Sequence, residues 1–244
     1  MQIANEVKRS DQSDYRIVVL LSGSGSNLQA LIDSGLSSCI QLVVSNKANA
    51  FGIERAKKAG IATAVVPHAE FDGRKSFESA LIQEIDKVQP DLVVLAGFMR
   101  ILTAHFVTKF CGRLLNIHPS LLPKYQGLNT HQRAIDAGDP EAGASIHLVT
   151  EELDGGPVLA QARVPILDGD SAETLAKRVL TREHKLYAHV VRWFVDRRMS
   201  FQSADSTKVG EKDTESVSQA IMGEPLLDGK PFPEWGYDVT DILE

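Results

Sequence analysis

Short apolar runs recur at regular intervals through the first half of the chain, and each is followed by a segment of helical character. The runs IVVLL at 17–21 and LVVL at 92–95 show no alternation with polar residues, which is typical of strands buried on both faces of a sheet. This regular alternation predicts βαβ units and a mostly parallel, twisted sheet. The expected strands are 16–22, 40–45, 62–66, 91–96 and 113–117, and the expected helices are 26–34, 52–59, 72–88 and 103–110.

The pattern changes after Thr130. Residues 130–137 have a helical pattern, and the later apolar segments 144–150 and 158–164 are joined by a turn-rich link, which predicts an antiparallel pair. An amphipathic helix is expected over 172–197. The predicted fold class is therefore α/β, with a Rossmann-like N-terminal half and an antiparallel addition in the C-terminal half.

The ends of the chain differ in composition from the middle. Residues 1–14 are polar and lack the apolar core of a signal peptide, so a flexible extension is expected there. Residues 203–219 carry little hydrophobicity, which predicts a mobile loop within a C-terminal tail at 201–244, with a hairpin or an irregular stretch at 229–236. Residues 15–200 remain as the functional domain.

Charge and cysteine content disfavour several classes of protein. The 26 basic and 32 acidic residues give a net charge of −6, which argues against a nucleic-acid partner. No apolar run approaches the roughly 18 residues that a membrane helix needs. The two cysteines, Cys39 and Cys111, lie in no metal-ligand spacing and form no disulfide framework. We therefore expect a cytoplasmic protein that acts on small molecules, without a membrane or a metal.

The sequence SGSGSN at 22–27 follows the first expected strand and opens a helix. A dinucleotide-binding fingerprint would need a glycine where Leu28 stands and an acidic residue where Asn46 stands. A Walker loop is excluded because no Gly-Lys-Ser/Thr closes the stretch. Two glycines with Ser and Asn leave backbone N–H groups free at a helix N-terminus, which favours a monophosphate site over an ordinary βα turn.

The stretch AGFMRIL at 96–102 leaves the fourth expected strand at its carboxyl end. Ligands of open parallel sheets bind in the crevice outside those ends. The apolar residues Met99, Ile101 and Leu102 suit a flat aromatic ligand whose ring edge bonds to the backbone. Core packing is the simpler explanation when this stretch is taken alone.

Asn116 and His118 stand at the end of the fifth expected strand, in LLNIHP. Side chains alternate along a strand, so both point to the same side, and Pro119, which lacks an N–H, ends the ladder there. An amide donor beside a titratable ring is what a developing oxyanion and a moving proton require. We therefore interpret this pair as catalytic rather than as a histidine that only closes a strand.

Two acidic residues complete the candidate set. Asp154, in the turn ELDGGP at 152–157, is the best-placed acid to face His118. An opposite charge is expected to raise the pKa of the histidine toward neutrality or above. Glu183, in REHKLY on the last long helix, is either a solvated residue or a contact for a substrate amine.

Five stretches in a fixed order resemble the phosphoribosylglycinamide formyltransferases, a branch of the family that uses 10-formyltetrahydrofolate. They are SGSGSN, SNKANAFG, AGFMRIL, LLNIHPSLLPKYQG and ELDGGP. The similarity covers about residues 15–200, which it identifies as a formyltransferase domain. The NIHPSLLP and LDGG stretches are shared by the wider family, whereas SGSGSN followed by SNKANAFG is particular to the glycinamide branch.

The resemblance implies an enzyme that transfers a formyl group from 10-formyltetrahydrofolate to the amine of N1-(5-phospho-D-ribosyl)glycinamide in de novo purine (IMP) biosynthesis. It implies that no metal takes part and that the protein is a monomer or a homodimer. The implied roles are catalysis by Asn116, His118 and Asp154, phosphate binding by Gly25, Ser26 and Asn27, a glycinamide contact by Glu183, and folate binding by Arg74, Met99, Arg100, Ile101, Leu102 and Asn116.

Three alternatives remain open. A methionyl-tRNA formyltransferase normally carries a basic C-terminal domain, but residues 203–244 are short and not basic. A formyltetrahydrofolate hydrolase usually carries an N-terminal regulatory domain, for which residues 1–14 are too short. A non-catalytic ligand-binding module on the same fold is disfavoured by the intact catalytic set.

Gln126 and Asn129 depart from the Pro and His that the family often has at these positions.

Overall fold

The structure, a computed structural model, describes residues 14–202 and 223–243. Most of the predicted N-terminal extension and the predicted polar loop at 203–219 lie outside the described residues. The strands are β1 (Ile17–Leu21), β2 (Ile40–Ser45), β3 (Thr63–Val65), β4 (Leu92–Leu95), β5 (Leu114–His118), β6 (Glu141–Leu148), β7 (Val158–Pro165), β8 (Met199–Phe201), β9 (Pro225–Leu227), β10 (Lys230–Pro231) and β11 (Tyr237–Asp238). The α-helices are α1 (Ser26–Leu31), α2 (Phe51–Lys58), α3 (Arg74–Asp86), α4 (Ala104–Lys109), α5 (Thr130–Asp136) and α6 (Ala172–Val195).

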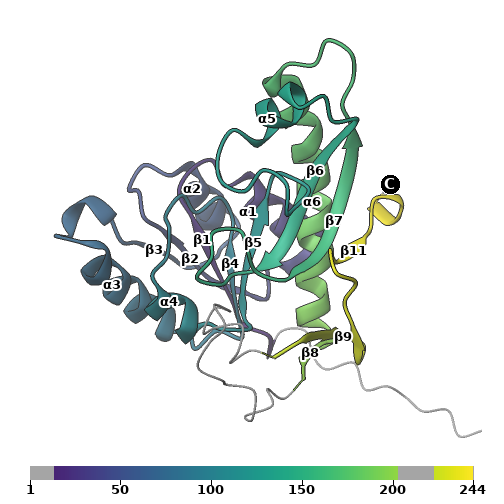
Figure 1. Cartoon of the computed structure of the whole chain (residues 1–244). Coiled ribbons are helices and arrows are strands. Elements are labelled where there is room, and N and C mark those ends of the chain that lie inside the picture. Colours follow the sequence, from purple (N-terminus) through teal and green to yellow (C-terminus); the bar gives the residue numbers. More distant parts are fainter. Residues whose placement is uncertain (1–13, 203–222, 244) are drawn as a thin grey trace, which may run out of the picture.

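One large sheet organises the molecule, in the strand order β11-β7-β6-β5-β4-β1-β2-β3 (Figure 1). Strands β1 to β5 are parallel, and β6 runs antiparallel to both β5 and β7. The small second sheet of β10, β9 and β8 is antiparallel. The predicted fold class, a mostly parallel sheet with an antiparallel addition, is confirmed. The chain turns from one side of β1 to the other between β3 and β4, which creates the switch point where open α/β sheets bind ligands.

Helices cover both faces of the sheet (Figure 1). Ile17, Val19 and Leu21 of β1 share one apolar cluster with residues of α1, α2 and α6. Val18 and Leu20, which point the other way, share a second cluster with residues of α3 and α4. All five side chains are fully buried. This two-sided burial is the physical reason for the unbroken apolar run in the sequence.

Helix α6 is fixed to the sheet by a buried tyrosine. The hydroxyl of Tyr187 lies 2.9 Å from the carbonyl oxygen of Leu95 in β4 and 3.2 Å from that of Leu115 in β5. The helix begins with a capping box, in which Ser171 and Thr174 each accept a hydrogen bond from the other's backbone N–H. The position of α6 along its own axis is therefore set relative to β4 and β5.

Most predicted boundaries differ from the structure by one to three residues, and three of the differences change how an element is built. Strand β5 extends to His118, one residue beyond the prediction, so the histidine is part of the ladder with β6. Strand β6 begins at Glu141 because its pairing with β7 continues to Pro165. The first predicted helix is divided, since α1 ends at Leu31 and a π-helical turn follows in which Gly35 has a φ of 83°.

The C-terminal segment contains a hairpin, one of the two possibilities expected at 229–236, but it lies earlier, in β9 and β10, and strands β8 and β11 were not predicted. Strands β8 and β9 pair with each other, and β10 pairs with β9. Strand β11 lies parallel to the edge strand β7, so this segment extends the large sheet. At Gly236, φ is 74° and a Cβ atom would lie 2.6 Å from the carbonyl carbon of Leu159, so only glycine fits this approach. The division of the chain near residue 200 stays a prediction.

Candidate active site

Three loops meet at the carboxyl edge of the sheet, because β1, β4 and β5 are neighbours in that order. They are the loop after Leu21, the loop after Leu95, and the segment after His118. Neighbouring strands lie about 4.8 Å apart, so the ends of β1 and β5 are separated by roughly 10 Å. The fold therefore brings the three motifs that were singled out in the sequence to a single crevice.

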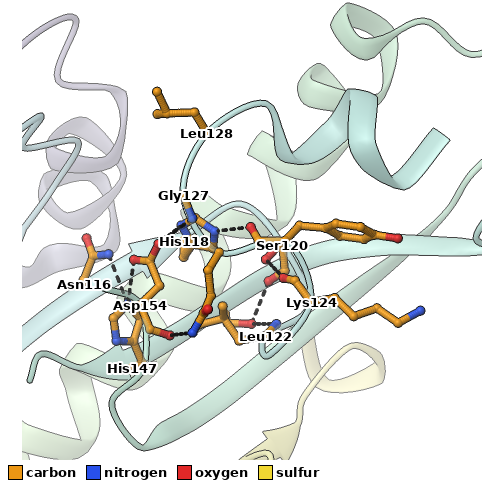
Figure 2. Close-up of polar contacts among 12 residues, drawn as sticks. Asn116, His118, Ser120, Leu122, Lys124, Gly127, Leu128, His147 and Asp154 are labelled. Carbon is orange, nitrogen blue, oxygen red and sulfur yellow. Dashed lines mark hydrogen bonds and ion pairs between the residues drawn. The ribbon is translucent and has the colours of Figure 1, made fainter. Parts of the chain in front are cut away.

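Asp154 lies against His118, as the sequence predicted (Figure 2). Its Oδ2 atom is 3.4 Å from Nδ1 of the ring. The other ring nitrogen, Nε2, is 2.9 Å from the carbonyl oxygen of Tyr125. A carbonyl oxygen only accepts hydrogen bonds, so this contact places the proton of a neutral ring on Nε2. Asn116 lies two residues earlier on the same strand and beside the same carboxylate (Figure 2).

The turn ELDGGP presents Asp154 in a left-handed conformation with a φ of 51°, which aspartate adopts more readily than most residues. Its Oδ2 atom accepts a hydrogen bond of 2.9 Å from the N–H of Gly127. At Gly156, a Cβ atom would lie 1.9 Å from the carbonyl oxygen of Leu148, so the turn closes tightly against β6. The glycines of this motif are what bring the carboxylate to the histidine.

The expected rise in the pKa of His118 is wrong. Burial lowers the pKa of this ring, and the Tyr125 carbonyl and the Asp154 carboxylate offset that effect only in part. The side chain is 6% exposed, so the loss of solvation outweighs the nearby negative charge. Burial acts to raise the pKa of Asp154, but contacts with the His147 ring and the Gly127 N–H outweigh it, and the pKa of Asp154 is lowered. At neutral pH, His118 is mainly neutral and Asp154 is ionised.

A second histidine, His147 on β6, belongs to the same cluster and was not singled out in the sequence (Figure 2). Its Nε2 atom is 3.1 Å from the amide nitrogen of Asn116 and 3.6 Å from Oδ1 of Asp154. Its Nδ1 atom is 3.0 Å from the carbonyl oxygen of Leu148, which fixes a proton there. The ring thus links the amide of Asn116 to the carboxylate of Asp154: without a proton, Nε2 accepts a hydrogen bond from Asn116, and with one it donates to Asp154. A histidine between the apolar residues Ile146 and Leu148 was the available signal.

A cavity of about 820 Å³ opens beside these residues. Of the residues expected to bind folate, Asn116 and the loop Met99–Leu102 line it, and His118, His147 and Asp154 line it as well. Met99 is 70% exposed and Ile101 is 58% exposed, so neither is a core residue. Arg74, the first residue of α3, is exposed and is not among the lining residues.

The residues expected to bind the ribonucleotide lie at and near the start of α1, and none of them lines this cavity. Gly25 is the N-cap of α1 with a φ of 72°, and a Cβ atom there would lie 2.5 Å from the Cα atom of Gly52. The amide nitrogen of Asn27 donates to Oε2 of Glu183 at 3.2 Å. Both side chains are buried, and Oδ1 of Asn27 has no partner among the described residues. Burial raises the pKa of Glu183, although the Asn27 contact opposes this.

Neither a metal-ligand cluster nor a membrane-spanning helix is found in the described part of the chain. No group of three or more His, Cys, Asp or Glu residues in the described part of the chain is placed to hold a metal ion. Among the described helices, none is both long and apolar enough to cross a bilayer. The site offers an oriented amide donor, a neutral imidazole and an ionised carboxylate beside a large, mainly apolar cavity. This combination defines an enzyme that transfers an acyl group to a small-molecule acceptor.

Comparison with known proteins identifies the acyl group. A family model described as formyl transferase matches residues 15–191. Phosphoribosylglycinamide formyltransferase of Escherichia coli K12 is 56% identical over 187 residues, which cover 75% of this chain and 88% of that protein. The crystal structure of the Coxiella burnetii phosphoribosylglycinamide formyltransferase is 44% identical, with a TM-score of 0.80, over 92% of this chain and 98% of that one. The chain therefore belongs to the formyl transferase family and, within it, to the phosphoribosylglycinamide formyltransferases.

One relative is a much longer protein. The trifunctional purine biosynthetic protein adenosine-3 of Bos taurus is 46% identical over 176 residues, which are 70% of this chain but 17% of that protein. The match therefore concerns one part of a multifunctional chain.

Proposed function

We propose that the protein transfers the formyl group of 10-formyltetrahydrofolate to the amine of N1-(5-phospho-D-ribosyl)glycinamide, in de novo purine synthesis. The observation that carries the proposal is that β1, β4 and β5 end side by side, with the Asn27–Glu183 pair after β1 and a large cavity at the ends of β4 and β5 that both Met99 and His118 line. A substrate with a phosphate at one end and an amine at the other fits a span of roughly 10 Å between strand ends. The proposal includes small-molecule substrates, a cytoplasmic location and a monomer or homodimer.

In this proposal the two ends of the acceptor meet different groups. The backbone N–H groups of Gly25, Ser26 and Asn27 bind the phosphate, since the first N–H groups of a helix have no partner inside it. The carboxyl group of Glu183 accepts a hydrogen bond from the glycinamide amine. Because burial raises the pKa of Glu183, it is also a better proton acceptor than an exposed glutamate.

Asn116 and His118 stabilise the charge that forms during the transfer. When the amine nitrogen bonds to the formyl carbon, negative charge collects on the formyl oxygen. An amide nitrogen has two N–H groups, so Asn116 keeps one for this oxygen while the other bonds to His147. His118 supplies a second donor, its Nε2–H. To reach the formyl oxygen, this N–H must first give up its hydrogen bond to the Tyr125 carbonyl. Preorganised donors of this kind lower the barrier to the charged intermediate.

Asp154 supports the proton transfer that completes the reaction. The amine loses a proton and the leaving folate nitrogen gains one. Negative charge on the formyl oxygen raises the pKa of His118, and the ionised Asp154 at 3.4 Å stabilises the imidazolium that results. The proton passes through His118 itself or through a water held by Asp154. Both routes need the same carboxylate.

The test is an assay with competing acceptors. The protein is given 10-formyltetrahydrofolate with glycinamide ribonucleotide, initiator methionyl-tRNA and water as alternative acceptors, and the products are separated. We expect formylated ribonucleotide as the dominant product. Formyl-methionyl-tRNA as the main product, or formate with no formylated amine, would replace the proposal with one of the two alternative formyl-folate enzymes. No turnover with any acceptor would favour a binding module.

Asn27→Asp is expected to raise KM for the ribonucleotide by about tenfold or more, with little change in KM for the formyl donor. The variant sets a second carboxylate beside the buried Glu183 and close to the proposed phosphate site, and like charges repel strongly where water is scarce. Steady-state kinetics with each substrate varied in turn measure both constants. Gln41→Glu, which adds the same charge at an exposed position of β2, is the control. An increase confined to the donor KM would remove Asn27 from the acceptor site.

A further inference from the structure

Ser22, the residue that follows β1, bonds to the loop that follows β4. Its N–H donates to the carbonyl oxygen of Gly97 at 3.1 Å. Its Oγ atom accepts a hydrogen bond of 2.8 Å from the N–H of Met99. The same hydroxyl is 2.6 Å from Oδ1 of Asn46, to which it donates its proton. The hydroxyl is thus used once as an acceptor and once as a donor, and its orientation is determined.

Asn46 is in turn held by His68, in the turn that follows β3. Its amide nitrogen is 3.2 Å from Nδ1 of His68, and its carbonyl oxygen accepts a hydrogen bond from the His68 N–H at 3.3 Å. Asn46 is 1% exposed and Ser22 is 4% exposed, so neither bond competes with bulk water. Asn46 is the residue that stands in place of the acid of a dinucleotide site, and the proposed reaction gives it no other role.

The loop that Ser22 holds is anchored by one buried side chain and by its bonds to Ser22. Met99 and Ile101 are mostly exposed in the large cavity, whereas Phe98 is buried in the apolar cluster that contains residues of α3 and α4. The two hydrogen bonds to Ser22 fix the backbone on either side of Phe98, at Gly97 and Met99. Ser22 also directly precedes the glycine-rich loop before α1, so one residue joins the segments proposed to bind the two substrates.

We propose that Ser22, oriented by Asn46, is a positioning residue that places the loop 97–101 for binding of the formyl-folate. The inference rests on the proposed function, which assigns folate to this loop. A serine that only stabilised the fold would change the melting temperature and leave the two KM values alone. A positioning serine changes the KM for one substrate, since the loop it holds contacts that substrate only.

Ser22→Ala is expected to raise KM for the formyl donor by about tenfold, the effect of one lost net hydrogen bond, with KM for the ribonucleotide within about twofold of wild type. Hydrogen exchange at the Met99 amide is expected to accelerate by a similar factor. Ser34→Ala is the matched control, because Ser34 is a half-buried serine in the π-helical turn after α1, and its hydroxyl donates to the carbonyl oxygen of Leu31. It should change neither quantity.

Asn46→Ala provides a second, independent variant. It should reproduce the selective rise in the donor KM, and the double variant should be no worse than the more affected single one, because both residues act through the same hydroxyl. Wild-type protein without formyl transfer would overturn the proposed function and this inference together. Active wild type with an unchanged donor KM in Ser22→Ala, or equal rises in both KM values, would overturn this inference alone.

Discussion

His118→Ala is expected to reduce kcat by more than about 10³, since loss of one oxyanion donor costs about 10²–10³ and loss of proton transfer adds to it. The ring combines an N–H donor with a carboxylate neighbour at the end of β5, two residues after Asn116. Binding of both substrates should change much less, because among the described residues no hydrogen bond joins this ring to the Asn27–Glu183 pair or to the loop at Met99. Single-turnover rates and substrate titrations measure the two effects separately.

The control for this variant is His105→Ala, which removes an exposed histidine on α4. Its kcat should equal that of wild type. Thermal unfolding of both variants tests whether the fold survives. A folded His118→Ala protein that keeps more than about a tenth of the wild-type kcat would exclude the ring as oxyanion donor and proton carrier.

Asp154→Asn is expected to lower kcat by about 10² and to lower the pKa of His118 further. Asparagine tolerates the left-handed backbone at this position and keeps an oxygen for the Gly127 N–H, so the variant removes charge with little change in shape. Since Asp154 raises the pKa of His118 against the effect of burial, its loss makes the imidazolium form at lower pH. His118 enters the proposed reaction as a neutral ring, so the acidic limb of the pH–rate profile, where activity falls as the ring is protonated, should move to lower pH.

Titration of His118 by NMR in the wild type and in the variant measures this shift directly. Asp168→Asn, which neutralises an exposed aspartate in the loop before α6, should leave both the pKa and kcat unchanged. An identical pKa for His118 in wild type and Asp154→Asn would show that the carboxylate has another role.

The central sheet could be predicted because its strands are buried on both sides. Val18 and Val19 point to opposite faces and are both fully buried. The strand therefore contains no polar residue that would interrupt its apolar pattern in the sequence. The same alternation predicted that Asn116 and His118 share one side of β5. Both inferences need only the local sequence and the geometry of a single strand.

Features that depend on distant segments could not be predicted. His147 reaches Asn116 because the two residues are opposite each other in the β5–β6 ladder, and that register is set by the whole antiparallel unit. The lowered pKa of His118 depends on burial by segments far apart in the chain. Strands β8 and β9 have three residues each, too few for a recognisable pattern. The folate contact expected for Arg74 remains a prediction.

In the proposed function, the contact between Tyr187 and the sheet sets the length of acceptor that fits between Glu183 and the catalytic residues. Glu183 is four residues before Tyr187 and so lies on the same side of α6, about 6 Å away along the axis. Each residue inserted between them would shift Glu183 by about 1.5 Å and turn it by about 100°. Changes in chain length within this turn of the helix therefore alter the substrate that fits, whereas changes in the loop at 166–170 leave that spacing intact.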